Sequence, residues 1–244
     1  MHVAVGTQSS HWARCGTLCC LIPWKQLGRA AVPDGELILS QRGEEFAIRL
    51  RGAELMNSRS HQSEELLASL ACASIATTSR AHVLVGGLGM GFTLRAALTA
   101  LPGDAKVSVA ELVPEIVEWN RGPLGHLANH PLNDPRVEVI AGDVAAAIEA
   151  ARYHAILLDV DNGPEAFTTP GNAHLYGVRG LARIRRQLVP NGVLGVWSVA
   201  DDRSFTGRLR AVGFKVLPHK VPPRPHSGAR HMIWVATALP EARP

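Results

Sequence analysis

A glycine cluster between two apolar runs constrains this chain more than any other stretch. The run Val83–Val85 leads into the cluster, and a helical stretch and a second apolar run that closes on Glu111 follow it. Glu111 lies about 20 residues past the cluster, the spacing at which a carboxylate meets the ribose hydroxyls of a nucleotide bound to a βαβ unit. We therefore predict a nucleoside site in which Glu111 holds the ribose and the glycine backbone approaches the ligand. The cluster consists of Gly86, Gly87, Gly89 and Gly91.

The composition is that of a folded protein with a sizeable core. Of the 244 residues, 46% are hydrophobic and 19% are charged. Because no apolar run approaches the ~20 residues of a membrane-spanning helix, we expect no membrane partner. The net charge is only +4, and the basic residues of the last third are scattered without interleaved aromatic residues, so we expect no nucleic-acid partner. Neither a signal-peptide pattern nor a disulfide framework is found, which predicts a cytoplasmic location.

Residues 1–34 are predicted to form an N-terminal tail that is partly disordered. His11, Cys15 and Cys19 recur at intervals of four in this tail. They lack the usual zinc spacing and a second ligand pair, so no metal site is predicted.

Residues 35–80 are predicted to form a small element beside the main domain. Alternating residues at 36–40 and 46–50 indicate a β-hairpin, and residues 51–60 are expected to be a loop. From His61 onward, apolar positions recur at helical spacing, which predicts a helix that packs on the main domain.

Residues 81–244 alternate strands and helices, which predicts a mostly parallel sheet covered on both faces. The last two strands are joined by a Pro-rich connection that is too short for a parallel crossover, so they are expected to pair antiparallel. The fold class is therefore α/β, a Rossmann-like, seven-stranded, mostly parallel sheet with an antiparallel last strand. The strands are expected at 82–86, 106–111, 136–140, 154–159, 192–199, 214–219 and 230–236. The helices are expected near 92–101, 113–120, 143–151, 174–188 and 202–212.

Acidic residues follow the strands at the edge where ligands of parallel sheets bind. Asp143 opens a helix after the third strand and is either an N-cap or a contact for the adenine of the nucleoside. Asp159 and Asp161, next to Asn162, follow the fourth strand. Carboxylates in that place accept a proton from an amine nucleophile or hold a cationic substrate, so we predict both acids to be catalytic.

The combination of these motifs resembles the spermidine synthase (aminopropyltransferase) family over roughly residues 35–236. That family has a glycine motif leading to a strand-end Glu, an Asp-Pro-Arg-Val segment before a Gly-Asp, and an Asp-x-x-Asp-Pro loop. The matching segments here are Gly86–Gly91 with Glu111, Asp134–Val137 with Gly142 and Asp143, and Asp159–Pro164. The resemblance implies the class I S-adenosylmethionine-dependent methyltransferase fold, a small-molecule acceptor and a homodimer. It also implies S-adenosylmethionine or its decarboxylated form as co-substrate.

Departures from the family pattern bear on the substrate. Gly89 stands where the family has an Asp that holds the aminopropyl ammonium. Ser63 replaces the tyrosine of a Tyr-His-Glu motif that ends here at Glu65, Asn162 replaces the second loop Asp, and Arg224 replaces a late tyrosine. The resemblance implies that these last four residues bind substrate. A guanidinium suits a carboxylate better than a diamine, so intact S-adenosylmethionine is slightly favoured as donor.

The predicted activity is transfer of an alkyl group from a sulfonium nucleoside to an amine or other small nucleophile, with methyl transfer slightly favoured. Aminopropyl transfer that makes a polyamine is the alternative within the same enzyme class. A non-catalytic nucleoside-binding or dimerisation module is the alternative outside it. Asp159 and Asp161 weigh against that module, because a site that only binds a nucleoside requires Glu111 but not two further carboxylates.

Overall fold

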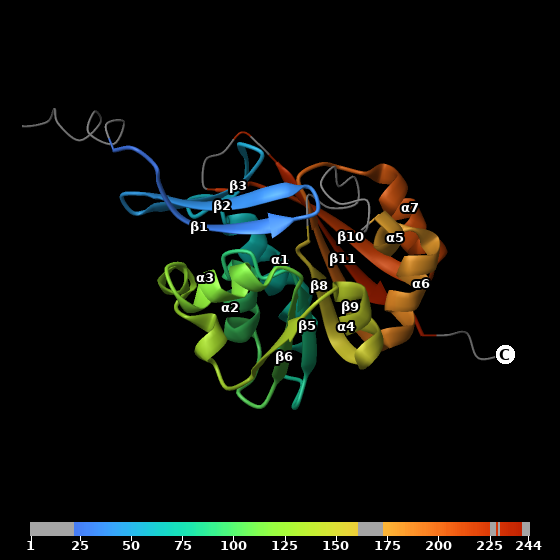
Figure 1. The fold of residues 1–244 in the computed structure, drawn as a ribbon. Coiled ribbons are helices and arrows are strands. Elements are labelled where there is room, and N and C mark those ends of the chain that lie inside the picture. The colour runs from blue at the N-terminus through green and yellow to red at the C-terminus, as the bar shows by residue number, and fades with distance from the viewer. Residues whose placement is uncertain (1–21, 161–172, 225–227, 229, 241–244) are drawn as a thin grey trace, which may run out of the picture.

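The computed structural model shows two β-sheets, with helices around the larger one (Figure 1). The structure describes residues 22–160, 173–224, 228 and 230–240. His11, Cys15, Cys19, Asp161 and Asn162 lie outside the described residues. In the described part of the chain, no helix is long and apolar enough to cross a membrane. Nor do three or more His, Cys, Asp or Glu side chains gather there in a way that could hold a metal ion.

The larger sheet has seven strands in the order β10-β11-β9-β8-β5-β6-β7. β11 runs antiparallel to both of its neighbours, and the other neighbouring pairs are parallel. The strands are β5 (His82–Gly86), β6 (Lys106–Glu111), β7 (Val137–Ala141), β8 (Tyr153–Leu158), β9 (Leu188–Ser198), β10 (Phe214–Val221) and β11 (His231–Ala238). The predicted fold class is confirmed.

The large sheet is buried on both faces because its strands are apolar on both sides. In β5, Val83 and Val85 face one core and Leu84 faces the other, since successive side chains of a strand point to opposite faces. All three are completely buried. Each such side chain contributes about 1.5–3 kcal/mol by burial, which fixes the register of the strand.

Helices cover each face of the large sheet. α1, α2 and α3 supply side chains to the first core, and α4 to α7 supply side chains to the second (Figure 1). The helix expected over 174–188 is divided at Gly177, whose backbone is extended (φ −75°, ψ 162°). The helices are α1 (Gln62–Cys72), α2 (Phe92–Ala100), α3 (Pro114–Arg121), α4 (Val144–Ala150), α5 (Ala173–Tyr176), α6 (Val178–Gln187) and α7 (Arg203–Ala211). Short 3-10 turns lie at Ala73–Ile75, Gly125–Ala128 and Pro131–Asn133.

The smaller sheet is an antiparallel meander in the order β1-β2-β3-β4. The expected hairpin is formed by β2 (Gly35–Arg42) and β3 (Glu45–Leu50). Two expectations were wrong at its edges. β1 (Lys25–Val32) lies in the range expected to be a tail, and β4 (Ala53–Asn57) lies in the expected loop. Both are edge strands with mostly exposed or half-buried side chains, so their sequences lack a clear alternation of apolar and polar residues.

The small sheet packs directly on the main domain. Leu39 and Ile48 are completely buried in the core that also contains α1 and α2. Gly28 of β1 lies against Trp119 of α3, so closely that a Cβ at position 28 would be 2.5 Å from the indole Nε1. The small sheet therefore shares a core with the large, seven-stranded domain.

Candidate active site

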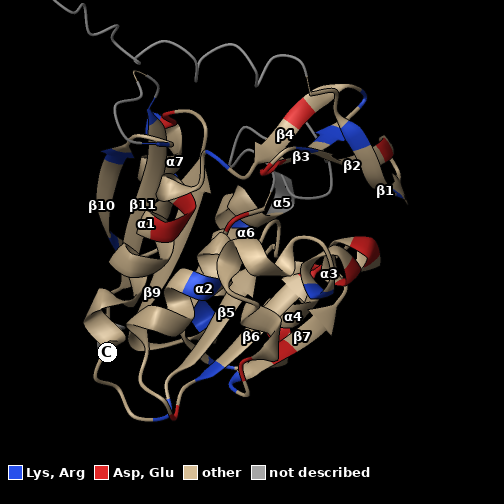
Figure 2. Ribbon diagram, turned by 90° about the vertical axis from the view of Figure 1, so that its left-hand side faces the viewer, with Lys and Arg blue, Asp and Glu red and all other residues tan. Residues whose placement is uncertain are grey.

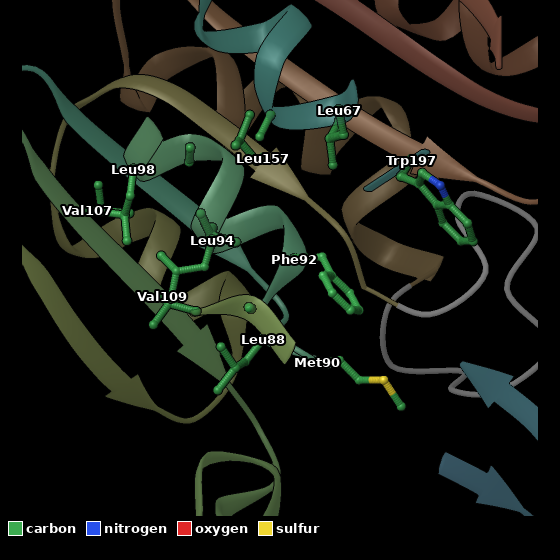
Figure 3. Close-up of a cluster of buried hydrophobic side chains, with 14 of the residues drawn as sticks. Leu67, Leu88, Met90, Phe92, Leu94, Leu98, Val107, Val109, Leu157 and Trp197 are labelled. Carbon is green, nitrogen blue, oxygen red and sulfur yellow. The ribbon is translucent and has the colours of Figure 1, made fainter. Parts of the chain in front are cut away.

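A cavity of about 420 Å³ lies between the small sheet and the carboxyl ends of β5, β6 and β8. The β1–β2 turn, β3 and β4 line one side of it, and the glycine turn after β5 lines the other. Leu88, Met90 and Phe92 of that turn connect the cavity to the core beneath, in the cluster that Figure 3 shows with Trp197. The volume falls in the range of small-molecule sites, roughly 300–1,000 Å³.

Glu111 ends β6 and is held in place by the glycine turn. Its exposed fraction is 7%, and its two carboxylate oxygens accept hydrogen bonds from the backbone N–H groups of Leu88 (3.0 Å) and Val113 (2.9 Å). Burial raises the pKa of Glu111, and the two backbone N–H donors oppose that rise. Each carboxylate oxygen has a further lone pair, so the group can still accept hydrogen bonds from the hydroxyls of a ribose.

The glycines of the turn are not equivalent. Gly87 and Gly89 line the cavity, whereas Gly86 and Gly91 do not. Gly87 has a φ of +87°, and a Cβ on it would lie 2.4 Å from the carbonyl oxygen of Asp159. Gly86 is the buried end of β5, and Gly91 precedes α2. These two glycines shape the turn but do not reach the cavity, so the cofactor contact predicted for them is not supported.

Gly89 faces the small sheet across the cavity. A Cβ on Gly89 would lie 3.4 Å from the Sδ of Met56 in β4. The thioether of Met56 therefore occupies the space beside the position at which related enzymes are expected to have an Asp.

Asp143 lines the cavity and also caps α4. Its side chain accepts a hydrogen bond from the backbone N–H of Ala145 at 2.8 Å. The capping alternative is thus observed. Contact of Asp143 with an adenine stays a prediction, compatible with its place at the cavity wall.

Asp159 and Glu64 form a pair of neighbouring carboxylates that line the same cavity as Glu111. Asp159 follows β8 and accepts a hydrogen bond from the hydroxyl of Thr93 in α2 at 2.5 Å. The same hydroxyl oxygen lies 3.4 Å from the backbone carbonyl oxygen of Glu64, in the acidic first turn of α1 (Figure 2). Burial raises the pKa of Asp159 to about 6. Burial and then repulsion from Asp159 raise the pKa of Glu64 to about 7.

Three of the residues predicted to bind substrate lie away from the cavity lining. Ser63 is completely buried beneath Glu64, and Arg224 is exposed at the surface. The Glu65 carboxylate accepts a hydrogen bond from Arg95, and Nδ1 of His61 lies 2.7 Å from its Oε1, so the carboxylate is already paired. Asp161 and Asn162 are outside the described residues, and their predicted roles stay predictions.

The charge of the cavity is entirely acidic. No Lys or Arg is among the lining residues of the described chain. The acidic lining residues are Asp34, Glu64, Glu111, Asp143 and Asp159. Such a lining favours a ligand that carries positive charge.

Sequence reasoning missed Glu64, Thr93 and Met56. Each comes from an element other than the strand ends that were searched, and α1 and β4 reach the site only through long-range packing. The available signal for Glu64 was its place next to Ser63 in the helix motif.

Comparisons with known proteins agree with this architecture. No family model matches the chain. It is 26% identical over 197 residues to the polyamine aminopropyltransferase of Mycobacterium tuberculosis, a match over 76% of this chain and 36% of that protein. It is 36% identical over 98 residues to putrescine N-methyltransferase 4 of Nicotiana tabacum, covering 39% of this chain and 24% of that protein. The chain thus spans about a third or less of the length of these curated relatives.

Solved structures extend the likeness to the fold. Spermidine synthase from Thermotoga maritima superposes with a TM-score of 0.68 at 18% identity, over 87% of this chain and 72% of that one. In its fold, the chain is spermidine synthase-like. Human methyltransferase-like protein 13, solved in complex with SAH, shares the fold more distantly, with a TM-score of 0.54 at 21% identity over 76% of this chain and 85% of that one. The spermidine synthase-like chain therefore has the class I methyltransferase fold.

Proposed function

We propose that this spermidine synthase-like chain is an alkyltransferase that passes one alkyl group from a sulfonium nucleoside to an amine. One observation carries the proposal: a single cavity holds Glu111, anchored by the glycine turn, and the carboxylates of Asp159 and Glu64. The first is suited to a ribose and the second to a cationic nucleophile.

The nucleoside half of the site uses fixed groups. Glu111 accepts hydrogen bonds from the ribose hydroxyls, and Gly87 and Gly89 let the backbone approach the methionine side of the donor. Asp143, at the start of α4, is placed to accept a hydrogen bond from the adenine amine. These residues suit a sulfonium nucleoside because the lining also supplies acidic groups for its positive charge.

The reacting half of the site works mainly by positioning. The sulfonium is already a good leaving group, so the protein has to align the amine nitrogen with the carbon that is transferred. Asp159 orients the amine, and the acidic lining stabilises the positive charge that passes from sulfur to nitrogen during the transfer.

Between the two donors, intact S-adenosylmethionine remains slightly favoured, since Gly89 offers no acid for an aminopropyl ammonium. Decarboxylated S-adenosylmethionine is the second candidate, and a specific observation supports it. Arg224 does not line the cavity, and the described lining has no other cation for a donor carboxylate. A polyamine or diamine is the proposed acceptor class, in line with the names of the curated relatives. The homodimer and the cytoplasmic location stay predictions.

Calorimetry with S-adenosylmethionine, its decarboxylated form and methylthioadenosine tests the proposal. We expect at least one of the three to bind, and Glu111→Ala to abolish that binding. Glu118→Ala is the matched control, because Glu118 is an exposed acid on α3 whose carboxylate pairs with Arg121. If none of the three nucleosides binds, the proposal that the chain is an alkyltransferase is refuted. If Glu111→Ala binds with unchanged affinity, the proposal that Glu111 holds the ribose is refuted.

A further inference from the structure

A chain of hydrogen bonds runs from the cavity wall to the start of β11. The hydroxyl of Ser63 lies 2.6 Å from Oε2 of Glu64 and 2.9 Å from Nδ1 of His231. Ser63 is completely buried, so water does not compete for its hydroxyl. Glu64 lines the cavity at one end of the chain, and His231 is half-buried at the other.

We propose that Glu64, Ser63 and His231 form the route by which the proton of the amine acceptor leaves the site. The inference rests on the proposed function, because an amine must lose a proton before it can attack an alkyl carbon. It assigns to Glu64 the role of proton acceptor and to Asp159, bonded to Thr93, the role of orienting the ammonium.

The proton balance of the reaction is simple. The acceptor enters as an ammonium and gives one proton to the carboxylate of Glu64, which frees the nitrogen lone pair. The nitrogen then bonds to the carbon on the sulfonium, and the electron pair of the broken S–C bond stays on sulfur. The product nitrogen carries the positive charge, and the proton on Glu64 is the net proton released.

The relay needs one tautomer of His231. Protonated Glu64 donates to the Ser63 oxygen while the Ser63 hydroxyl donates to Nδ1, so that nitrogen must carry the free lone pair. The resulting imidazolium loses its other proton from Nε2. Burial lowers the pKa of His231, so the imidazolium is short-lived at neutral pH and the ring returns to its neutral form.

The charged groups around Glu64 favour this division of roles. The charged and titratable groups beside Glu64 are Glu65 of its own helix, Asp159 at the end of β8 and, through Ser63, His231 of β11. Arg95 and His61 both pair with Glu65. Among the described residues Glu64 thus lies beside Asp159 with no ion pair to a Lys or Arg, and a carboxylate in that setting holds a proton near neutral pH.

Glu118 provides a matched control. It carries the same side chain as Glu64, lies exposed on α3 and does not line the cavity. Glu64→Gln and Glu118→Gln therefore make the same chemical change, one on the proposed route and one off it.

The decisive experiment is the pH profile of alkyl transfer with putrescine as acceptor, measured with each donor from about pH 5 to about pH 9. For the wild type we expect kcat/KM to fall as pH drops below about 7, the pKa of Glu64. Glu64→Gln should lower kcat by about 10²–10⁴-fold, the usual contribution of a positioned base, and remove this acid limb. Glu118→Gln should keep both the wild-type kcat and the acid limb. Ser63→Ala should lower kcat with unchanged nucleoside affinity, and Ser63→Thr should restore it.

A titration of the His231 ring by NMR needs no turnover. In the wild type we expect a second inflection in its chemical shift as Glu64 ionises, and we expect Glu64→Gln and Ser63→Ala to remove it. Any of three results would overturn the route. They are a pH profile of Glu64→Gln that keeps the acid limb of the wild type, a kcat of Ser63→Ala equal to that of the wild type, and a wild-type titration of His231 with only one inflection. Failure of the wild type to bind any sulfonium nucleoside would instead overturn the proposed function.

Discussion

Replacement of Gly87 by alanine tests whether the glycine turn and the loop after β8 are held in one rigid arrangement. The backbone N–H of Gly87 donates to the carbonyl of Ala110, and the N–H of Asp159 donates to the carbonyl of Gly86, each at 2.9 Å. These bonds hold the Asp159 carbonyl where an added Cβ at position 87 would meet it at 2.4 Å. Real Cβ contacts of that length essentially never occur, so the turn and the loop must separate.

Gly52 supplies a control with a similar positive φ and no neighbouring atom near the position of a Cβ. Its φ is +82°, close to the +87° of Gly87, but nothing lies within 4 Å of a Cβ added there. Gly52→Ala therefore loses only the free energy of holding an alanine in the left-handed conformation, about 1–2 kcal/mol. Gly87→Ala incurs the same cost and in addition an overpacking cost of about 1–3 kcal/mol, so its total is roughly 2–5 kcal/mol. That is a large part of the 5–15 kcal/mol typical of domain stability.

The assay is denaturant unfolding of the two variants and the wild type, together with calorimetry of the donor. We expect Gly87→Ala to lose more stability than Gly52→Ala and to bind the nucleoside weakly, because the displaced loop carries Asp159. Gly52→Ala should bind normally. Equal stability losses in the two variants, or normal binding by Gly87→Ala, would show that the turn yields easily and that its closeness to Asp159 does not matter.

Two further predictions concern the pH dependence of stability. Hydrogen bonds from Arg136 lower the pKa of Asp134 in the folded state, so Asp134 adds stability that is present above about pH 4 and lost as pH falls through the lowered value. Asp134→Asn should therefore lower the unfolding free energy at pH 7 and not at pH 2; an equal loss at both would contradict the pairing. Glu64 behaves oppositely: its pKa is raised by burial, so stability falls as pH rises from about 4.5 to about 7. Glu64→Gln should be more stable than the wild type at pH 8 and similar to it at pH 4. A variant that is less stable than the wild type at pH 8 would refute the claim that burial of the ionised Glu64 carboxylate destabilises the fold.

The central strands could be predicted from the sequence because burial on both faces leaves a strong pattern. Val83–Val85 and the glycines after it mark β5 unmistakably, and Glu111 ends β6 as expected. The carboxyl ends of parallel strands share one edge, so Glu111 and Asp159 were brought to one cavity by topology alone. The edge strands β1 and β4 leave no such pattern, since much of their surface stays exposed.

The rest of the site depends on contacts between distant parts of the chain. Nothing near Ser63 in sequence indicates that it bonds to His231, 168 positions away. Nothing near Arg224 indicates that it stays exposed at the surface instead of entering the cavity. The departures from the spermidine synthase pattern predicted a changed substrate half, and the contacts that these residues make could be identified only from packing.

The cavity has one wall from each sheet, and this division has a consequence for how ligand selectivity can vary. The small sheet contributes Asp34, Leu55, Met56 and Asn57 to the lining, and the backbone bonds that hold Glu111 come entirely from the large domain. Side chains on the small sheet can therefore be exchanged without breaking the bonds that position the carboxylate of Glu111. Under the proposed function, a library confined to the inner face of the meander should change the choice of amine while the affinity for the nucleoside is kept.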